Sequence, residues 1–141
     1  MSDLHRKIRE NRYGLVKIPS FSDSRGSLSI SESQNLPFEI KRVFWIYEIG
    51  EGKTRGGHAH STCQEIVFAI SGSFDIFIDN GKEQQTFHID KPDTGIYIGA
   101  NVWCELSNFS EGTVCVALAS EPYNSKGYIN DKDEFNKVFS K

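Results

Sequence analysis

Residues 52–72 read GKTRGGHAHSTCQEIVFAISG, and the fold of the rest of the chain is predicted outward from this stretch. His58 and His60 stand two residues apart, so on an extended strand both side chains point to the same side. The run at 66–70 is apolar and rich in β-branched residues, as in a buried strand, and Gly72 permits a tight turn after it. The pattern predicts two histidines near the start of a hairpin, facing one interior. The alternative is two surface histidines on a polar loop.

The chain on both sides of this hairpin also has the pattern of short strands. Residues 27–31 and 73–79 alternate in period two, residues 113–120 form an apolar central strand, and turn residues recur about every 8 to 12 positions. Asn80-Gly81 predicts a type I′ hairpin turn, and residues 40–49 predict a strand with two mixed faces. About nine or ten strands and one helix at 131–140 predict an all-β fold, an antiparallel β-barrel or jelly roll with a short C-terminal helix.

Length and composition narrow the class of protein. A chain of 141 residues predicts one domain at 13–141, preceded at 1–12 by a charged arm that is either a short helix or frayed. The net charge of −3, without a basic block, argues against a nucleic-acid partner. No apolar run approaches the ~20 residues of a membrane helix, and the polar N-terminus does not resemble a signal peptide. Three cysteines without a CxxC pair are typical of a reduced, cytoplasmic protein.

The spacing G-x5-H-x-H-x4-E-x6-G resembles the first motif of the cupin superfamily. Metal-binding cupins usually supply a third histidine later, in a pattern ending H-x3-N, and here Cys104 and Asn108 stand at those positions. One interpretation is a metal site made of His58, His60, Glu65 and Cys104, because imidazole and thiolate are good zinc ligands. The simpler interpretation is that no metal binds and that the two histidines work as an acid/base pair near neutral pH.

Two arginines stand directly before glycines, Arg25 before Gly26 and Arg55 before Gly56. A guanidinium presents a planar fork that suits phosphate oxygens, and glycine lets the backbone approach a ligand closely. Each arginine can equally be a solvated turn residue. Because both pairs flank strands that feed one barrel, the sequence favours an anion site near the histidines.

With these motifs in view, the chain resembles the dTDP-sugar 3,4-ketoisomerases, which are related to the dTDP-4-keto-6-deoxy sugar epimerases. The likeness covers about residues 14–139 and includes four shared elements: Arg55–His60, the hairpin at 72–81, residues 41–43 and residues 119–123. It implies that a dTDP-4-keto-6-deoxyhexose is converted into its 3-keto isomer through an enediolate. It also implies that no metal or other cofactor takes part, and that the product feeds the biosynthesis of 3-amino-3,6-dideoxy sugars for surface polysaccharide.

The same resemblance implies roles for single residues. His58 would be the base that removes the proton at C3, and His60 would move a proton between the oxygens or to C4. Arg25 and Arg55 would hold the pyrophosphate. The remaining substrate contacts would come from Arg42 and from aromatic packing of Tyr47, Trp45 or Trp103 on the thymine or the sugar. Cys104 stands where family members often carry histidine, so a third acid/base group is not expected there.

The resemblance further implies a homodimer in which the N-terminal strands are exchanged. The connection at 32–39 contains Pro37 and few apolar residues, which suits a segment that leaves its own barrel. The expected partners are therefore a dTDP-linked 4-keto-6-deoxy sugar and a second copy of the chain, without nucleic acid or membrane. Two other classes stay open, a metal-dependent cupin enzyme and a non-catalytic cupin that binds a sugar nucleotide.

Overall fold

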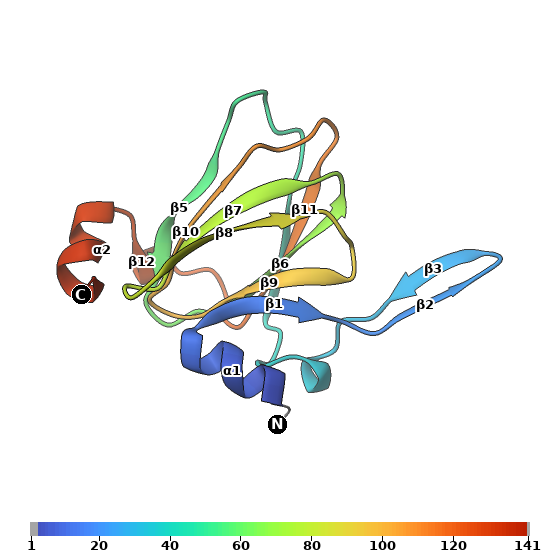
Figure 1. Ribbon diagram of the computed structural model, residues 1–141, viewed down its shortest axis with the longest axis horizontal. Coiled ribbons are helices and arrows are strands. Elements are labelled where there is room, and N and C mark those ends of the chain that lie inside the picture. Colours follow the sequence, from blue (N-terminus) through green and yellow to red (C-terminus); the bar gives the residue numbers. More distant parts are fainter. Residues whose placement is uncertain (1–2, 141) are drawn as a thin grey trace.

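The structure is a computed structural model that describes residues 3–140, and its main body consists of two antiparallel five-stranded sheets (Figure 1). The first sheet has the order β1 (Tyr13–Lys17), β9 (Thr94–Ile98), β6 (Glu65–Ser71), β11 (Val114–Ala119) and β4 (Arg42–Ile46). The second has the order β12 (Tyr128–Ile129), β5 (Arg55–His60), β10 (Trp103–Ser107), β7 (Phe74–Asp79) and β8 (Gln84–Ile89). The predicted all-β fold is confirmed in its jelly-roll form, because the strands form two sheets and not one closed barrel.

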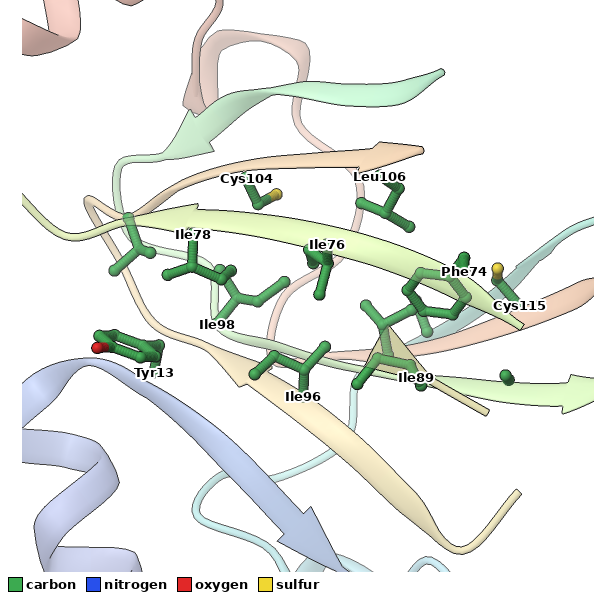
Figure 2. Packing of buried hydrophobic residues seen from close by; sticks show 14 residues of the cluster. Tyr13, Phe74, Ile76, Ile78, Ile89, Ile96, Ile98, Cys104, Leu106 and Cys115 are labelled. Carbon is green, nitrogen blue, oxygen red and sulfur yellow. The ribbon is translucent and has the colours of Figure 1, made fainter. Parts of the chain in front are cut away.

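The hydrophobic core lies between the two sheets. Figure 2 shows Ile76 and Ile78 of β7 packed with Ile96 and Ile98 of β9, which come from opposite sheets. These side chains are two residues apart on their strands, so the alternation read from the sequence places them all on inner faces. Each of these isoleucines is fully buried, which stabilises the fold by about 1.5–3 kcal/mol per side chain.

The charged N-terminal segment forms helix α1 (Asp3–Asn11), which is docked on the body of the protein. Ile8 is buried in a second apolar cluster that includes Val16 of β1 and Ile66 and Phe68 of β6, on the outer face of the first sheet. The Arg9 side chain also donates a hydrogen bond to the carbonyl of Pro37, beside the short 3₁₀ turn Ser33–Asn35. Of the two predicted alternatives, a short helix and a frayed arm, the described part of the segment is therefore the helix.

The predicted C-terminal helix is present as α2 (Lys132–Phe139), after a short 3₁₀ turn at Ser125–Gly127. Its N-cap is Asp131, whose side chain accepts a hydrogen bond from the Glu134 amide. Its buried Phe135 packs on Trp103, with ring centroids 5.9 Å apart, so α2 covers the outer face of the second sheet. None of the helices within residues 3–140 is long and apolar enough to cross a membrane.

Two local predictions are wrong. The β7–β8 hairpin exists, but its connection is not a type I′ turn, because Asn80 has a negative φ and its side chain accepts hydrogen bonds from the amides of Lys82 and Glu83. The predicted strand at 40–49 is shorter, since β4 ends at Ile46 and Glu48 turns the chain with φ of 54°. At Asn80 one kind of turn thus replaces another, and after Ile46 a turn replaces the expected extended backbone.

The hairpin of β2 (Ser20–Asp23) and β3 (Gly26–Ser29) stands apart from both sheets. Figure 1 shows it projecting from the body, and each of its eight strand residues is exposed. Phe21 and Leu28 are cross-strand partners, with 62% and 61% of their surface exposed. An apolar pair of this kind on an isolated hairpin lacks packing partners within the described chain.

Candidate active site

A cavity of about 170 Å³ lies between the inner faces of the two sheets. Its walls are mainly apolar side chains from β4, β6, β9, β10 and β11. Six residues bring polar groups to it: Arg55, His58, His60, Glu65, Cys104 and Tyr128. An apolar cavity with a few converging polar groups is the usual form of a small-molecule site.

The two histidines reach this cavity together from β5. The strand places their side chains on the same side, as predicted, and the ring centroids lie 5.0 Å apart. The ring of Tyr128 lies 5.0 Å from that of His58 and 4.6 Å from that of His60, because β12 pairs with β5 and sets Tyr128 opposite His60. The three rings therefore form one cluster of groups that can each take up or release a proton, at one end of the cavity.

A buried carboxylate stands behind His60. Glu65 begins β6 in the facing sheet, and its Oε1 lies 3.2 Å from His60 Nε2. The other oxygen lies 4.0 Å from the Arg42 guanidinium, whose carbon is 5.2 Å from the centre of the Phe44 ring. Arg42 therefore enters the site as a neighbour of Glu65.

The surroundings give His58 the properties of a neutral base. Burial lowers its pKa from the ordinary value of 6.5, and the charge of nearby His60 lowers it further, while Glu65 opposes the shift. Burial also raises the pKa of Tyr128, with Arg42 acting in the opposite direction. Near neutral pH, His58 is therefore free to accept a proton while the Tyr128 hydroxyl keeps its own.

The geometry gives little support to a metal site. Within residues 3–140, no three His, Cys, Asp or Glu side chains are arranged to hold a metal ion together. Burial strongly raises the pKa of the Cys104 thiol, and the charge of Glu65 adds to the effect, so the thiolate needed to bind zinc is disfavoured. Figure 2 shows Cys104 pointing into the apolar interior near Ile78. The side chain behaves as a small buried hydrophobe that shapes the cavity.

Arg55 lies on the wall of the cavity, at the start of β5. The next residue, Gly56, has φ of 81°, and a Cβ there would lie 3.0 Å from the Cys104 carbonyl. This glycine therefore lets β5 pack closely on β10 and turns the strand beside the cavity. A second hollow of about 280 Å³ is lined by residues 46–50 and 53–55, and it shares Ile46 and Arg55 with the first. The wall that Arg55 occupies therefore borders both spaces.

The structure does not bring the remaining predicted residues to the cavity within one chain. Arg25 lies at the tip of the projecting hairpin, where its side chain is 89% exposed and pairs with Asp23 at 2.6 Å. Tyr47 is exposed and lines the second hollow. Trp103 is buried under α2, because its side chain points to the sheet face opposite to that of Cys104. Trp103 therefore stabilises α2, and its side chain does not face the cavity where a substrate contact was predicted.

Tyr128 is the site residue that sequence reasoning missed. It belongs to a two-residue strand after a polar stretch, too short to show any periodicity. The sequence motif indicates Glu65 only as a metal ligand. Its place at the start of an apolar strand could also have marked it as a buried carboxylate, which needs a hydrogen-bonding or charged partner.

A jelly roll that presents an H-x-H pair in an apolar cavity defines the cupin class of proteins. The family model described as "FdtA: WxcM-like, C-terminal" matches residues 11–140, and the chain belongs to this family. The chain is 37% identical over 128 residues to the TDP-4-oxo-6-deoxy-alpha-D-glucose-3,4-oxoisomerase of Aneurinibacillus thermoaerophilus. That match covers 90% of this chain and 92% of the relative.

Two solved structures are also similar. The TDP-quinovose 3,4-ketoisomerase WlaRB of Campylobacter jejuni is 38% identical with a TM-score of 0.84, covering 89% of this chain and 97% of that one. The 3,4-ketoisomerase QdtA of Thermoanaerobacterium thermosaccharolyticum, a histidine-to-asparagine variant in complex with TDP-4-keto-6-deoxyglucose, is 32% identical with a TM-score of 0.87. Its match covers 91% of this chain and 94% of that one.

Proposed function

We propose that the protein is a dTDP-sugar 3,4-ketoisomerase, which converts a dTDP-4-keto-6-deoxyhexose into the 3-keto isomer in deoxysugar biosynthesis. The observation that carries the proposal is the pair His58 and His60, whose ring centroids lie 5.0 Å apart in the cavity between the sheets, in a chain that belongs to this family. The relatives named for this reaction support it. Its expected cytoplasmic location stays a prediction.

The reaction needs a base that removes a proton from carbon and a group that carries a proton between two oxygens. His58 takes the C3 proton, which the neighbouring ketone acidifies, and the C3–H electron pair forms the C3=C4 double bond of an enediolate. The C4 oxygen gains a proton as the C3 hydroxyl loses one, and His60 carries it between them. A proton then returns to C4, and the C3 oxygen becomes the ketone. Atoms and electrons balance within the sugar, so the net change is an internal redox exchange.

The nucleotide would lie outside the catalytic cavity. Arg55 stands on the wall shared by the two hollows, so a diphosphate held there would direct the sugar inward and the thymidine outward. In this arrangement Tyr47 lines the space for the base, where an aromatic ring can stack. Arg42 lies next to Glu65, on a small separate hollow that shares His60 and Tyr128 with the cavity, and would act on the sugar end. A charge-assisted Arg–phosphate contact of this kind is worth about 1.5–3 kcal/mol.

We also propose that the active species is a strand-exchanged homodimer. The β2–β3 hairpin has no packing partner within the described chain, and its exposed Phe21 and Leu28 need an apolar surface. The edge strand β4 offers such a surface through Val43 and Trp45, which are both exposed. A hairpin placed on a partner's sheet edge covers both groups of apolar residues, and it would carry Arg25 to the partner.

Incubation of the purified protein with dTDP-4-keto-6-deoxyglucose in D₂O tests the function. The 3-keto sugar nucleotide should form, with solvent deuterium at C3 of recovered substrate and at C4 of product, as read by proton NMR. Treatment with a chelator and metal analysis of the same sample separate this reaction from that of a metal-dependent enzyme. Binding of dTDP without deuterium exchange would show a sugar-nucleotide-binding protein and overturn the proposal.

A further inference from the structure

Glu65 is a charged group in an unusual place. It is only 5% exposed, it lies between two apolar sheets, and the reaction described above leaves it without a role. A carboxylate in such a place costs several kcal/mol of folding free energy unless hydrogen bonds or charges compensate for it. The groups that compensate for this buried charge therefore indicate the role of Glu65.

One neighbour is close enough to form a hydrogen bond with Glu65. His60 Nε2 lies 3.2 Å from Oε1, and His60 is itself 4% exposed. The Arg42 guanidinium lies 4.0 Å from Oε2, which is ion-pair range and beyond a direct hydrogen bond. An ionised carboxylate can only accept, so the hydrogen between Glu65 and His60 resides on Nε2. Nδ1 is then the ring nitrogen left with a lone pair.

Among the contacts of the described chain, His58 has no carboxylate as hydrogen-bond partner, and it bonds instead to the backbone of Gly56. Its pKa is lowered by burial and by the charge of His60, and Glu65 only weakens that shift. The other polar groups around the pair are the guanidinium groups of Arg42 from β4 and Arg55 from β5, the Cys104 thiol from β10 and the Tyr128 hydroxyl from β12. Two identical side chains thus have different surroundings, and different surroundings assign different roles to paired groups.

We propose that Glu65 is a positioning residue that holds the proton on His60 Nε2, so that Nδ1 carries the hydroxyl proton between the two sugar oxygens. When Nδ1 accepts the proton from the C3 hydroxyl, the ring becomes an imidazolium, and the carboxylate stabilises it. When Nδ1 gives that proton to the C4 oxygen, the ring returns to its starting form. This role of a buried carboxylate beside a histidine follows the logic of catalytic triads. The proposed role of Glu65 rests on the proposed function, and it assigns a different proton transfer to each of the two histidines.

Glu65→Gln keeps the size of the side chain and removes its charge. We expect kcat for isomerisation to fall at least about 10²-fold, with KM changed less than about threefold, because oxygen-to-oxygen transfer is lost and binding is not. Deuterium exchange at C3 in D₂O should continue, since His58 performs that step. Glu65→Asp, which keeps the carboxylate, should recover part of kcat. Equal loss of C3 exchange and isomerisation in folded Glu65→Gln, or full activity in it, would overturn the role.

A second measurement needs no substrate. Long-range ¹⁵N–¹H spectra of the free protein report which ring nitrogen of each histidine bears hydrogen. The His60 signal is assigned with His60→Asn, and the exposed His88 serves as internal control. We expect the Nε2–H form of His60 in the wild type and a mixture of forms in Glu65→Gln. A wild-type Nδ1–H form would refute the inference even if the protein is an isomerase, whereas an inactive wild type with the Nε2–H form would refute the proposed function alone.

Discussion

At the scale of single residues, the site depends on an asymmetry between two histidines that share one strand. His58 loses its hydration on burial, and a positive charge on His60 would repel its protonated form, so the neutral form of His58 is favoured. His60 meets a carboxylate from the opposite sheet. The H-x-H spacing brings both rings into one cavity, but only the fold supplies Glu65 to one of them. This is why spacing alone identified the pair and did not separate the two roles.

Replacement of His58 by asparagine should remove the base. We expect isomerisation and deuterium exchange at C3 to fall together by about 10²-fold or more, because loss of a general base costs that much. The matched control is His88→Asn, which changes an exposed histidine paired with Asp75 outside the cavity and should leave the rate unchanged. A His58→Asn protein that keeps more than about a tenth of the C3 exchange rate would not fit a role as base.

The lowered pKa of His58 predicts the pH dependence of the reaction. A base works only when deprotonated, so kcat/KM should fall on the acid side with an apparent pKa below the ordinary 6.5. The same shift affects folding, because the unfolded chain takes up a proton that native His58 resists. The resulting loss of stability begins as the pH falls below 6.5. A rate profile measured from pH 4.5 to 8 checks the first point, and an acid limb centred above 6.5 would contradict it.

At the scale of elements, strand periodicity predicted most of the framework. The two-residue alternation of β7 predicted a strand with one inner face, and the apolar run of β11 predicted a strand in the centre of a sheet. The sequence does not report which face of a strand meets the cavity and which meets a helix. Trp103 and Cys104 illustrate this, since neighbouring residues of β10 face α2 and the cavity respectively. Tyr128 could not be predicted, because β12 gains its position only by pairing with β5.

Helix α2 is held on the second sheet by an ion pair between the buried Asp79 and the partly exposed Lys132, which can be tested separately. Asp79 is 2% exposed and accepts hydrogen bonds from Lys132 Nζ at 2.8 Å, the Gly81 amide at 2.8 Å and Gln84 Nε2 at 3.1 Å. Burial raises its pKa, but these hydrogen bonds, with that from Lys132 the strongest, outweigh burial and keep it below its ordinary value. The carboxylate therefore contributes more to the native state than to the unfolded chain.

Asp79→Asn should lower the free energy of unfolding by about 1–3 kcal/mol, since the amide replaces a charged acceptor in three hydrogen bonds. Urea unfolding followed by circular dichroism measures this loss. Asp90→Asn, at an exposed position, is the control and should stay within about 0.5 kcal/mol of wild type. The carboxylate's contribution is complete above pH 3.8 and is lost as the pH falls through the lowered native pKa, so the two proteins should converge in acid. A difference that stays constant down to pH 2.5 would assign the effect to packing.

At the scale of the whole molecule, one chain leaves its own predicted site incomplete. The sequence predicts that Arg25 joins Arg55 at the phosphates, but within one chain it belongs to the β2–β3 hairpin, which projects from the body (Figure 1). There it pairs with Asp23. Sequence reasoning located both Arg-Gly pairs. In the proposed dimer, the subunit whose site receives Arg25 depends on where the connection after β3 leads the chain. Sedimentation should accordingly show a species near twice the 15.9 kDa chain mass.

Subunit mixing decides whether Arg25 acts across the dimer. His58→Asn chains lack the base, and Arg25→Ala chains lack the cation that exchange would deliver to the partner, so each homodimer should be nearly inactive. In a mixed dimer, the Arg25→Ala chain keeps its own His58 and receives Arg25 from its partner, which restores one site of the two. Because random mixing makes about half of all dimers mixed, about a quarter of wild-type activity should return. Tagged chains and native mass spectrometry verify the exchange. Verified mixed dimers without activity would place Arg25 in the site of its own chain, and the hairpin would then have to fold back to reach Arg55.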